Sequence, residues 1–247
     1  MFDEVGLPKQ RKCVVAFIDF LGVSHKIKIE SQRALNSIWL FYQYITEEIK
    51  KYKKMNYKIF SDNILICEEV KEENFKQTIF NILQIVEKAE MFMMKMGALF
   101  TRGAVVVGDL HFSENFVYGN ALLEAHNIES NKAKYPRVII DESVLRIIKD
   151  EKLFIIQDKD GQYFYDFLHA KIQQGEERLS QELSTFQGNI LSNLMTKNVK
   201  SETIEKMEWL INYFNYSCAK NGLKKRITIE TLTRFKIDTS NIHLKSN

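Results

Sequence analysis

Two aspartates in this sequence stand at places where a carboxylate needs a partner. Asp19 follows the apolar run 13–18, and Asp62 lies in the polar turn 61–63 between two short apolar segments. A carboxylate buried without a partner is costly, and two of them on adjacent strands repel each other unless cations lie between them. Mg²⁺ and Mn²⁺ prefer oxygen ligands, and two such ions about 3.5–4 Å apart support phosphoryl transfer. The pair therefore indicates a two-metal site, against a structural alternative in which Asp19 caps a helix and Asp62 fills a turn.

Hydrophobic periodicity predicts the elements that place these aspartates. The expected elements are strands over 12–20, 57–60 and 64–67 and helices over 31–54 and 72–96. The order β-α-β-β-α-β, with additions, predicts an α+β fold with a split βαβ sheet of the ferredoxin-like or palm type, containing antiparallel strands and covered by helices on one face. In such a sheet the strand pair that carries Asp62 lies beside the strand that ends at Asp19.

The second half of the chain changes character along its length. The expected elements are a strand over 99–108, a hairpin or long excursion over 108–118, a helix over 119–130, a strand over 137–140, a short helix to 149 capped by Asp141, strands over 153–156 and 163–167, and a helix over 202–220. From about residue 171 onward only helical patterns occur, without a linker rich in Pro, Gly or Ser. We therefore expect a catalytic domain over 1–170 and a helical appendage over 171–247 that packs on it.

Composition excludes several classes of protein. The 247 residues carry 35 Lys and Arg against 32 Asp and Glu, and a net charge of +3 is too small to indicate a nucleic-acid-binding protein. Three cysteines with no CxxC pair indicate neither a disulfide framework nor a zinc site. No apolar run approaches the roughly 20 residues that span a bilayer, and the acidic start lacks the pattern of a signal peptide. We expect a reduced, soluble, cytoplasmic protein with no nucleic-acid or membrane partner, and the absence of a GxxxxGK[ST] motif removes the common NTPase interpretation.

Four segments occur in one order across residues 12–145. They are AFIDFLG at 16–22, KIFSD at 58–62, RGAVVVG at 102–108 and VYGN at 117–120. Together they resemble the motifs of the class III nucleotide cyclases, which have a strand ending in Asp before a turn with Gly, a Lys four residues before a second Asp, and a strand with Arg six residues before Gly. The resemblance implies the class III cyclase fold and a reaction in which a nucleoside triphosphate forms a cyclic monophosphate.

The same resemblance implies roles for individual residues. Asp19 and Asp62 would hold two Mg²⁺ or Mn²⁺ ions, with the backbone carbonyl of Phe20 as a further metal ligand. The metals would lower the pKa of the ribose 3′-hydroxyl and neutralise the leaving pyrophosphate. The implied nucleotide-binding residues are the turn whose N–H groups face phosphates and the lysine that reads the base: Phe20, Leu21, Gly22 and Lys58.

The sequence also departs from the adenylyl cyclase pattern. Phe116 stands where that pattern has a base-reading Asp, and Leu123 and Asn127 stand where it has the Asn and Arg that act on the transition state. Asn120 is the nearest amide that can read a base instead. A phosphoryl transfer still needs a cation besides the metals, for which Arg137 and Arg102 are the catalytic candidates, each with a structural ion pair as the equal alternative.

The whole pattern resembles the bacterial cyclases of Pycsar antiphage systems, which make cyclic UMP or cyclic CMP. The resemblance extends to YPRV at 135–138 and EWLINYFN at 208–215 and so reaches the helical tail. It implies a pyrimidine substrate, with UTP ahead of CTP, in antiphage defence. It also implies a homodimer with composite active sites and a separately encoded effector activated by the cyclic nucleotide.

Two other functions stay open at this point. The missing Asn and Arg favour a non-catalytic, palm-like nucleotide-binding or regulatory domain, and the paired aspartates also suit a different two-metal palm nucleotidyltransferase. A phosphatase with Asp19 as nucleophile is disfavoured, because Leu21 replaces the second Asp that such enzymes carry two residues later. The five histidines form no pair with the spacing of metal ligands, so a structural or exposed role is expected for each. For His111 alone, a catalytic role is kept as a minor alternative.

Overall fold

A single mixed β-sheet carries the candidate site of this protein. The computed structural model describes residues 1–97, 99–149, 151, 153–173, 179–195, 200–240 and 242–244. The strands are β1 (Arg11–Leu21), β2 (Met55–Phe60), β3 (Asn63–Glu69), β4 (Phe100–Phe112), β5 (Val117–Tyr118), β6 (Val138–Ile140), β7 (Ile155–Gln157) and β8 (Tyr163–Tyr165). Their order in the sheet is β2-β3-β1-β4-β6-β8-β7, with β5 paired to β4. Strand β1 is antiparallel to both neighbours, β3 and β4, whereas β4 and β6 are parallel.

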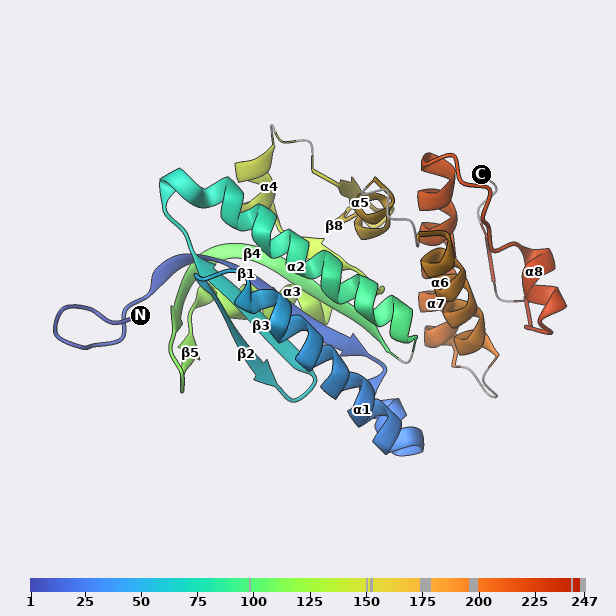
Figure 1. Ribbon diagram of the computed structural model, residues 1–247, viewed down its shortest axis with the longest axis horizontal. Coiled ribbons are helices and arrows are strands. Elements are labelled where there is room, and N and C mark those ends of the chain that lie inside the picture. The colour runs from blue at the N-terminus through green and yellow to red at the C-terminus, as the bar shows by residue number, and fades with distance from the viewer. Residues whose placement is uncertain are drawn as a thin grey trace.

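The helices cover both faces of this sheet (Figure 1). They are α1 (Val23–Lys50), η1 (Glu72–Asn74), α2 (Phe75–Met96), α3 (Asn120–Asn131), α4 (Glu142–Ile148), α5 (Phe167–Gln173), α6 (Leu179–Leu194), α7 (Ser201–Lys220) and α8 (Ile229–Arg234). The expected α+β sheet is confirmed. The expectation of helices on one face is wrong, because α1 and α2 cover one face and α3 covers the other.

Alternation along β1 decides which residues face each layer. Val14, Ala16 and Ile18 join the large core beneath α1 and α2, whereas Val15 and Phe17 join a smaller core beneath α3. Successive strand residues point to opposite faces, so the same alternation puts the odd-numbered Asp19 on the α3 side. The uninterrupted apolar run predicts a strand buried on both faces, which is confirmed, but it does not identify α3 as the element that covers the second face.

The boundaries of helices and strands differ from the prediction where exposed residues interrupt the apolar pattern. Helix α1 begins at Val23, directly after Gly22, whose φ of 83° is left-handed and favours glycine. It breaks at Glu30, whose φ of −142° and ψ of 50° are not helical, so the predicted start at residue 31 matches its second segment and the first segment was missed. Its first turns contain the exposed Ile27 and Lys28, so no apolar stripe marks them. Strand β4 runs on to Phe112, because its last residues pair with β5. The N-cap role expected of Asp141 is confirmed, since its carboxylate accepts a hydrogen bond from the Ser143 N–H.

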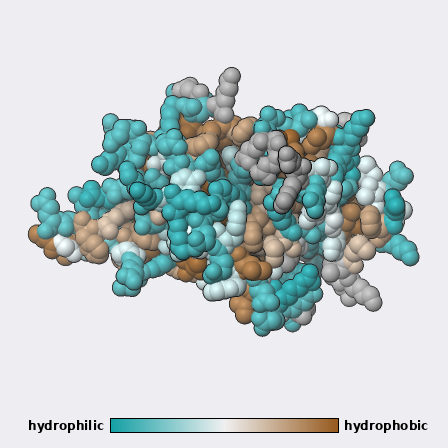
Figure 2. Space-filling view, viewed as in Figure 1, coloured by the Kyte–Doolittle hydropathy of each residue, from teal (hydrophilic) through white to brown (hydrophobic). Residues whose placement is uncertain are grey.

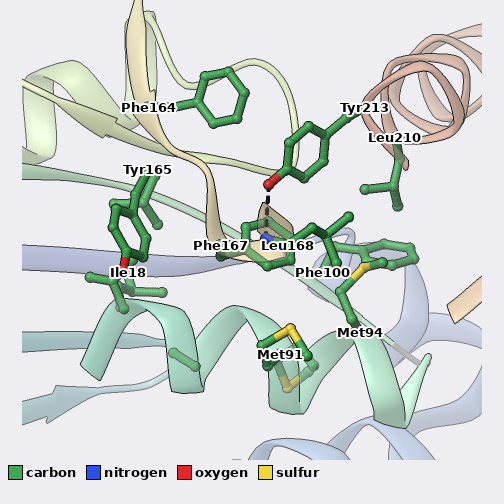
Figure 3. Close-up of a cluster of buried hydrophobic side chains, with 14 of the residues drawn as sticks. Ile18, Met91, Met94, Phe100, Phe164, Tyr165, Phe167, Leu168, Leu210 and Tyr213 are labelled. Atoms are coloured by element: carbon green, nitrogen blue, oxygen red, sulfur yellow. Dashed lines mark hydrogen bonds between the residues drawn. The ribbon is translucent and has the colours of Figure 1, made fainter. Parts of the chain in front are cut away.

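The C-terminal helices pack on the sheet domain through a buried polar contact (Figure 3). The Tyr213 hydroxyl on α7 accepts a hydrogen bond from the Leu168 N–H at 3.0 Å and donates one to Asp166 at 2.8 Å. Around it lie apolar side chains of α2, β4 and α5, among them Met91 and Met94. Helix α5 crosses the boundary expected at residue 170, and the division into 1–170 and 171–247 stays a prediction.

The surface is mostly polar, with apolar side chains gathered in a few places. The N-terminal arm exposes Phe2, Val5 and Leu7. Brown and tan atoms lie among the teal ones at the left end of Figure 2, where Figure 1 places this arm. Phe116 and Tyr118 on the β4–β5 hairpin are also about half exposed, at 49% and 59%. Cys13, Cys67 and Cys218 are free and buried. Within the described residues no helix has the length and apolar character needed to cross a membrane.

Candidate active site

The register of the sheet places Asp19 in one row with two site residues. Asp19 pairs with Asn63 of β3 on one side and with Arg102 of β4 on the other. Asp62 directly precedes Asn63 in the β2–β3 turn, so the register brings both predicted metal ligands to the same end of the sheet. The negative charge of Asp62 is one of the influences that raise the pKa of Asp19, which reflects this proximity.

Tyr42 of α1 supports the turn that carries Asp62. Its hydroxyl proton is shared between the backbone carbonyls of Ser61, at 3.0 Å, and Asn63, at 3.3 Å. Ser61 has a positive φ of 54°, which is uncommon for a residue with a side chain and fixes a tight turn. Burial and the charges of Asp62 and Asp19 raise the pKa of Tyr42, so the hydroxyl remains a donor.

Arg102 joins Asp19 to a buried carboxylate on α3. Its Nη2 lies 3.0 Å from Asp19 Oδ2 and 2.6 Å from Glu129 Oε1, and its Nε lies 3.1 Å from the same Asp19 oxygen. Burial is the largest influence on Asp19 and, with the charge of Glu129, raises the pKa of Asp19 to about 6, although Arg102 acts in the opposite direction. The guanidinium therefore compensates only part of the negative charge at this end of the sheet.

The turn after β1 leads directly into the N-terminus of α1. The ring of Phe20 is buried against Phe41, at 4.8 Å between centroids, which anchors the end of the strand. Leu21 is half-buried and Gly22 is exposed. The free N–H groups at the start of a helix are suited to bind a phosphate, and here they begin the segment of α1 that precedes its break at Glu30. The structure thus places the turn predicted to bind phosphates next to the aspartates.

Asn120 lies away from the aspartates of the same chain, whereas Lys58 lies on β2 four residues before Asp62, level with Phe17 of β1. Lys58 on β2 donates a hydrogen bond to the backbone carbonyl of Glu114 in the β4–β5 hairpin. Asn120 is exposed and begins α3, after Gly119, whose positive φ of 148° and close approach to the carbonyl of Asp109 leave no room for a side chain. Glu129 beside Arg102 lies nine residues farther along α3, about 14 Å at 1.5 Å per residue. Asn120 and the metal-binding end of the sheet therefore lie at opposite ends of α3.

Arg137 is completely buried within its own chain. Its guanidinium forms ion pairs with Asp158 and Asp160 in the β7–β8 turn and lies 5.2 Å from the ring centroid of Tyr135. Trp209 of α7 donates its indole N–H to Asp158 at 2.5 Å. These contacts tie the β7–β8 hairpin to α7 and favour the structural ion pair over the transition-state role. His111 is also buried, with Nδ1 3.1 Å from the carbonyl of Lys9, and lies at the opposite end of β4 from Arg102.

The donor set fits a magnesium-type ion. Asp19 and Asp62 supply carboxylates, and the Phe20 carbonyl supplies a further oxygen at the end of β1. Asp19 and Glu129 share the guanidinium of Arg102, and Asp62 is close enough to raise the pKa of Asp19, so a divalent cation would neutralise the remaining negative charge. Among the described residues no group of three or more His, Cys, Asp and Glu side chains forms a closed cage. Mg²⁺ typically binds through one or two carboxylates and substrate phosphates while keeping several waters, which this open arrangement allows.

Comparisons with known proteins support the same interpretation of the fold. No family model matches this sequence, and no curated protein matches it. The structure is similar to the adenylyl cyclase CyaB from P. aeruginosa, with a TM-score of 0.50 and 16% identity over 63% of this chain and 93% of that one. It is also similar to the guanylyl cyclase domain of the RhoGC fusion protein from the aquatic fungus Blastocladiella emersonii, with a TM-score of 0.50 and 16% identity over 64% of this chain and 95% of that one. The sheet has the class III nucleotide cyclase fold.

Glu129 belongs to the segment after VYGN that resembles the cyclase helix, but its ion pair with Arg102 was not predicted. Glu129 belongs to the buried face of α3, which is otherwise made of Ala121, Ala125 and Ile128. A carboxylate on the buried stripe of a helix signals a polar partner, because an unpaired charge there is costly. Tyr42 gave no such signal, since an aromatic residue in the apolar stripe of α1 is expected in any case.

Proposed function

We propose that this protein is a nucleotide cyclase that converts a nucleoside triphosphate into a 3′,5′-cyclic monophosphate and pyrophosphate. The observation that carries the proposal is the convergence of Asp19 and Asp62 beside the N-terminus of α1. Asp19 and Asp62 would hold the metals, and the N–H groups of turn 20–22 would bind and orient the phosphates. Two Mg²⁺ or Mn²⁺ ions, when bound, would supply Lewis acidity for the 3′-hydroxyl and neutralise the pyrophosphate.

The proposed substrate is a pyrimidine nucleotide, with UTP preferred and CTP second. Support comes from Phe116, an exposed aromatic residue at the position where the adenylyl cyclase pattern has a base-reading carboxylate. The exposed amide of Asn120, which follows the β4–β5 hairpin, is a proposed base contact, and Lys58, which contacts the same hairpin, is the other. In the cell, the proposed role is antiphage signalling in bacteria through a separate effector activated by the cyclic nucleotide.

The proposed active form is a homodimer with composite sites. Within one chain the metal-binding end and Asn120 lie at opposite ends of α3, and a second copy would bring the aspartates of one chain and Asn120 of the other to one nucleotide. The exposed apolar residues of the N-terminal arm offer surface for such an association.

The experiment is an incubation of the purified protein with each common nucleoside triphosphate and Mn²⁺, followed by chromatography and mass spectrometry of the products. We expect cyclic UMP as the main product and a loss of about a hundredfold or more in Asp62→Ala. The matched control is Asp109→Asn, which removes an exposed aspartate of the same sheet and should leave the rate unchanged. Undiminished activity in Asp62→Ala would contradict the proposal.

A second candidate is a nucleotide-binding domain without turnover. Two observations favour this candidate. Arg137 is completely buried, so it is unavailable to a bound nucleotide. Leu123, which stands at a catalytic position of the family pattern, is apolar and 67% exposed. Calorimetry that detects nucleotide binding without any product would support this candidate. Linear or bridged dinucleotide products would instead indicate a different two-metal palm nucleotidyltransferase.

A further inference from the structure

The guanidinium of Arg102 is shared between two carboxylates that come from different layers of the fold. Asp19 lies on the central strand β1, and Glu129 lies on α3, with Nη2 of Arg102 at 3.0 and 2.6 Å from them. Both carboxylate side chains are largely buried, at 12% and 4% exposure. Arg102 is thus the cation that neutralises Asp19 in the metal-free protein.

A metal ion at Asp19 has to compete with this guanidinium. Both cations would share one carboxylate, and like charges at such close range repel each other strongly in a partly buried site. The competition is reduced only if Arg102 can leave Asp19 without losing its hydrogen-bond acceptors, because a buried guanidinium without acceptors is costly.

Helix α3 offers the acceptors that such a movement requires. Besides its ion pair with Glu129 Oε1, Arg102 directs Nη1 toward the backbone carbonyls of Glu129, at 3.4 Å, and Ala133, at 3.5 Å. All three oxygens lie on the side of the guanidinium that belongs to α3 and its C-terminal end, not to β1. A small shift of the side chain toward α3 would shorten these contacts and release Asp19.

We propose that Glu129 is a positioning residue for the metal site, which acts by holding Arg102 when a divalent cation takes Asp19. The inference rests on the proposed function in one respect, namely that Asp19 is a metal ligand. It goes beyond that function because it assigns Arg102 as the cation that neutralises Asp19 in the metal-free protein, and Glu129 as the carboxylate that holds Arg102 after the metal binds.

The experiment measures Mn²⁺ binding to the nucleotide-free protein by electron paramagnetic resonance of the unbound ion, which needs no turnover. In Glu129→Gln the guanidinium keeps only Asp19 as a charged partner, and we expect Mn²⁺ affinity about tenfold lower. In Arg102→Gln the competing cation is gone, and affinity should rise. Glu129→Asp, which keeps the charge on a shorter side chain, should recover part of the loss.

A double-mutant cycle separates this indirect role from a direct attraction between Glu129 and the metal. If Glu129 acts through Arg102, Glu129→Gln has little further effect in an Arg102→Gln background; an undiminished tenfold loss there would overturn the inference. Far-UV circular dichroism checks folding, and if Arg102→Gln does not fold, Arg102→Lys serves as the background, because a lysine cannot bridge two carboxylates with a planar fork. In that background we expect less than half of the loss, on a logarithmic scale, and an equal loss would again overturn the inference.

The controls distinguish failure of this inference from failure of the proposed function. Asp19→Ala should abolish Mn²⁺ binding at this site. If it does, while Glu129→Gln binds Mn²⁺ as the wild type does, the positioning role is wrong and the metal site stands. If the wild type binds no Mn²⁺, or Asp19→Ala binds it unchanged, the metal site of the proposed function is wrong together with the inference.

Discussion

Replacement of Arg137 by methionine tests whether this residue holds the fold or acts on the substrate. Methionine fills a similar volume but leaves the Asp158 carboxylate, only 14% exposed, without its cation. Breaking a buried ion pair by removing one partner costs about 3–5 kcal/mol. The Asp160 pair adds little, because that carboxylate is 39% exposed and solvent screens it.

We therefore expect a loss of about 3 kcal/mol in the free energy of unfolding. For a chain of this length, 1 kcal/mol corresponds to a change of roughly 2–4 °C in Tm, so Arg137→Met should melt about 6–12 °C lower. The assay is thermal unfolding followed by circular dichroism, together with the cyclase rate at a temperature well below the Tm of the variant. The matched control is Arg146→Met, which breaks an exposed pair with Glu142 and should change the stability by less than about 0.5 kcal/mol.

The two roles of Arg137 give opposite results. A structural residue lowers the Tm and leaves the rate of the folded protein close to that of the wild type. A variant that melts with the wild type but loses its activity would refute the structural assignment and restore the transition-state role.

Three further predictions concern the aspartate end of the sheet. The pKa of Asp19 is raised to about 6, so between pH 4 and 6 the folded protein holds a proton at Asp19 that the unfolded chain has lost. The contribution of Asp19 to the free energy of unfolding therefore falls as the pH rises through this window. Urea titrations at several pH values should show a flatter pH dependence for Asp19→Asn than for the wild type, and an equal dependence would contradict the raised pKa. Tyr42→Phe removes the donor to the carbonyls of Ser61 and Asn63 and should cost about 1–2 kcal/mol in denaturant unfolding with weaker Mn²⁺ binding; wild-type stability would contradict the supporting role. Gly22→Ala places a side chain at a φ of 83° and should cost about 1 kcal/mol, and an unchanged Tm would contradict the strain argument.

Local features of the sequence predicted the part of the site that lies on one strand and one turn. Asp19 and Asp62 could be predicted because each interrupts an apolar pattern, and the pairing of sequential strands brings them together. Gly22 marked the turn into α1, although the exposed first turns of that helix hid its start.

The remaining features depend on contacts that no local pattern encodes. Arg137 has its acidic partners in the β7–β8 turn and its aromatic neighbour Trp209 on α7, far along the chain. The sequence left its role open because an arginine after a proline has the same local appearance in either case. The bond between Arg102 and Glu129 depends likewise on α3 covering the second face of the sheet, which the prediction of a single helical layer excluded.

The most direct measurement offers the wild-type protein equimolar ATP, GTP, CTP and UTP with Mn²⁺ and identifies the products by mass. We predict a 3′,5′-cyclic monophosphate, mainly cyclic UMP, with an equal amount of pyrophosphate and no such product from Asp19→Ala or Asp62→Ala. The absence of any cyclic product from the folded wild type, in the presence of the metal, would contradict the assignment of this site as a nucleotide cyclase.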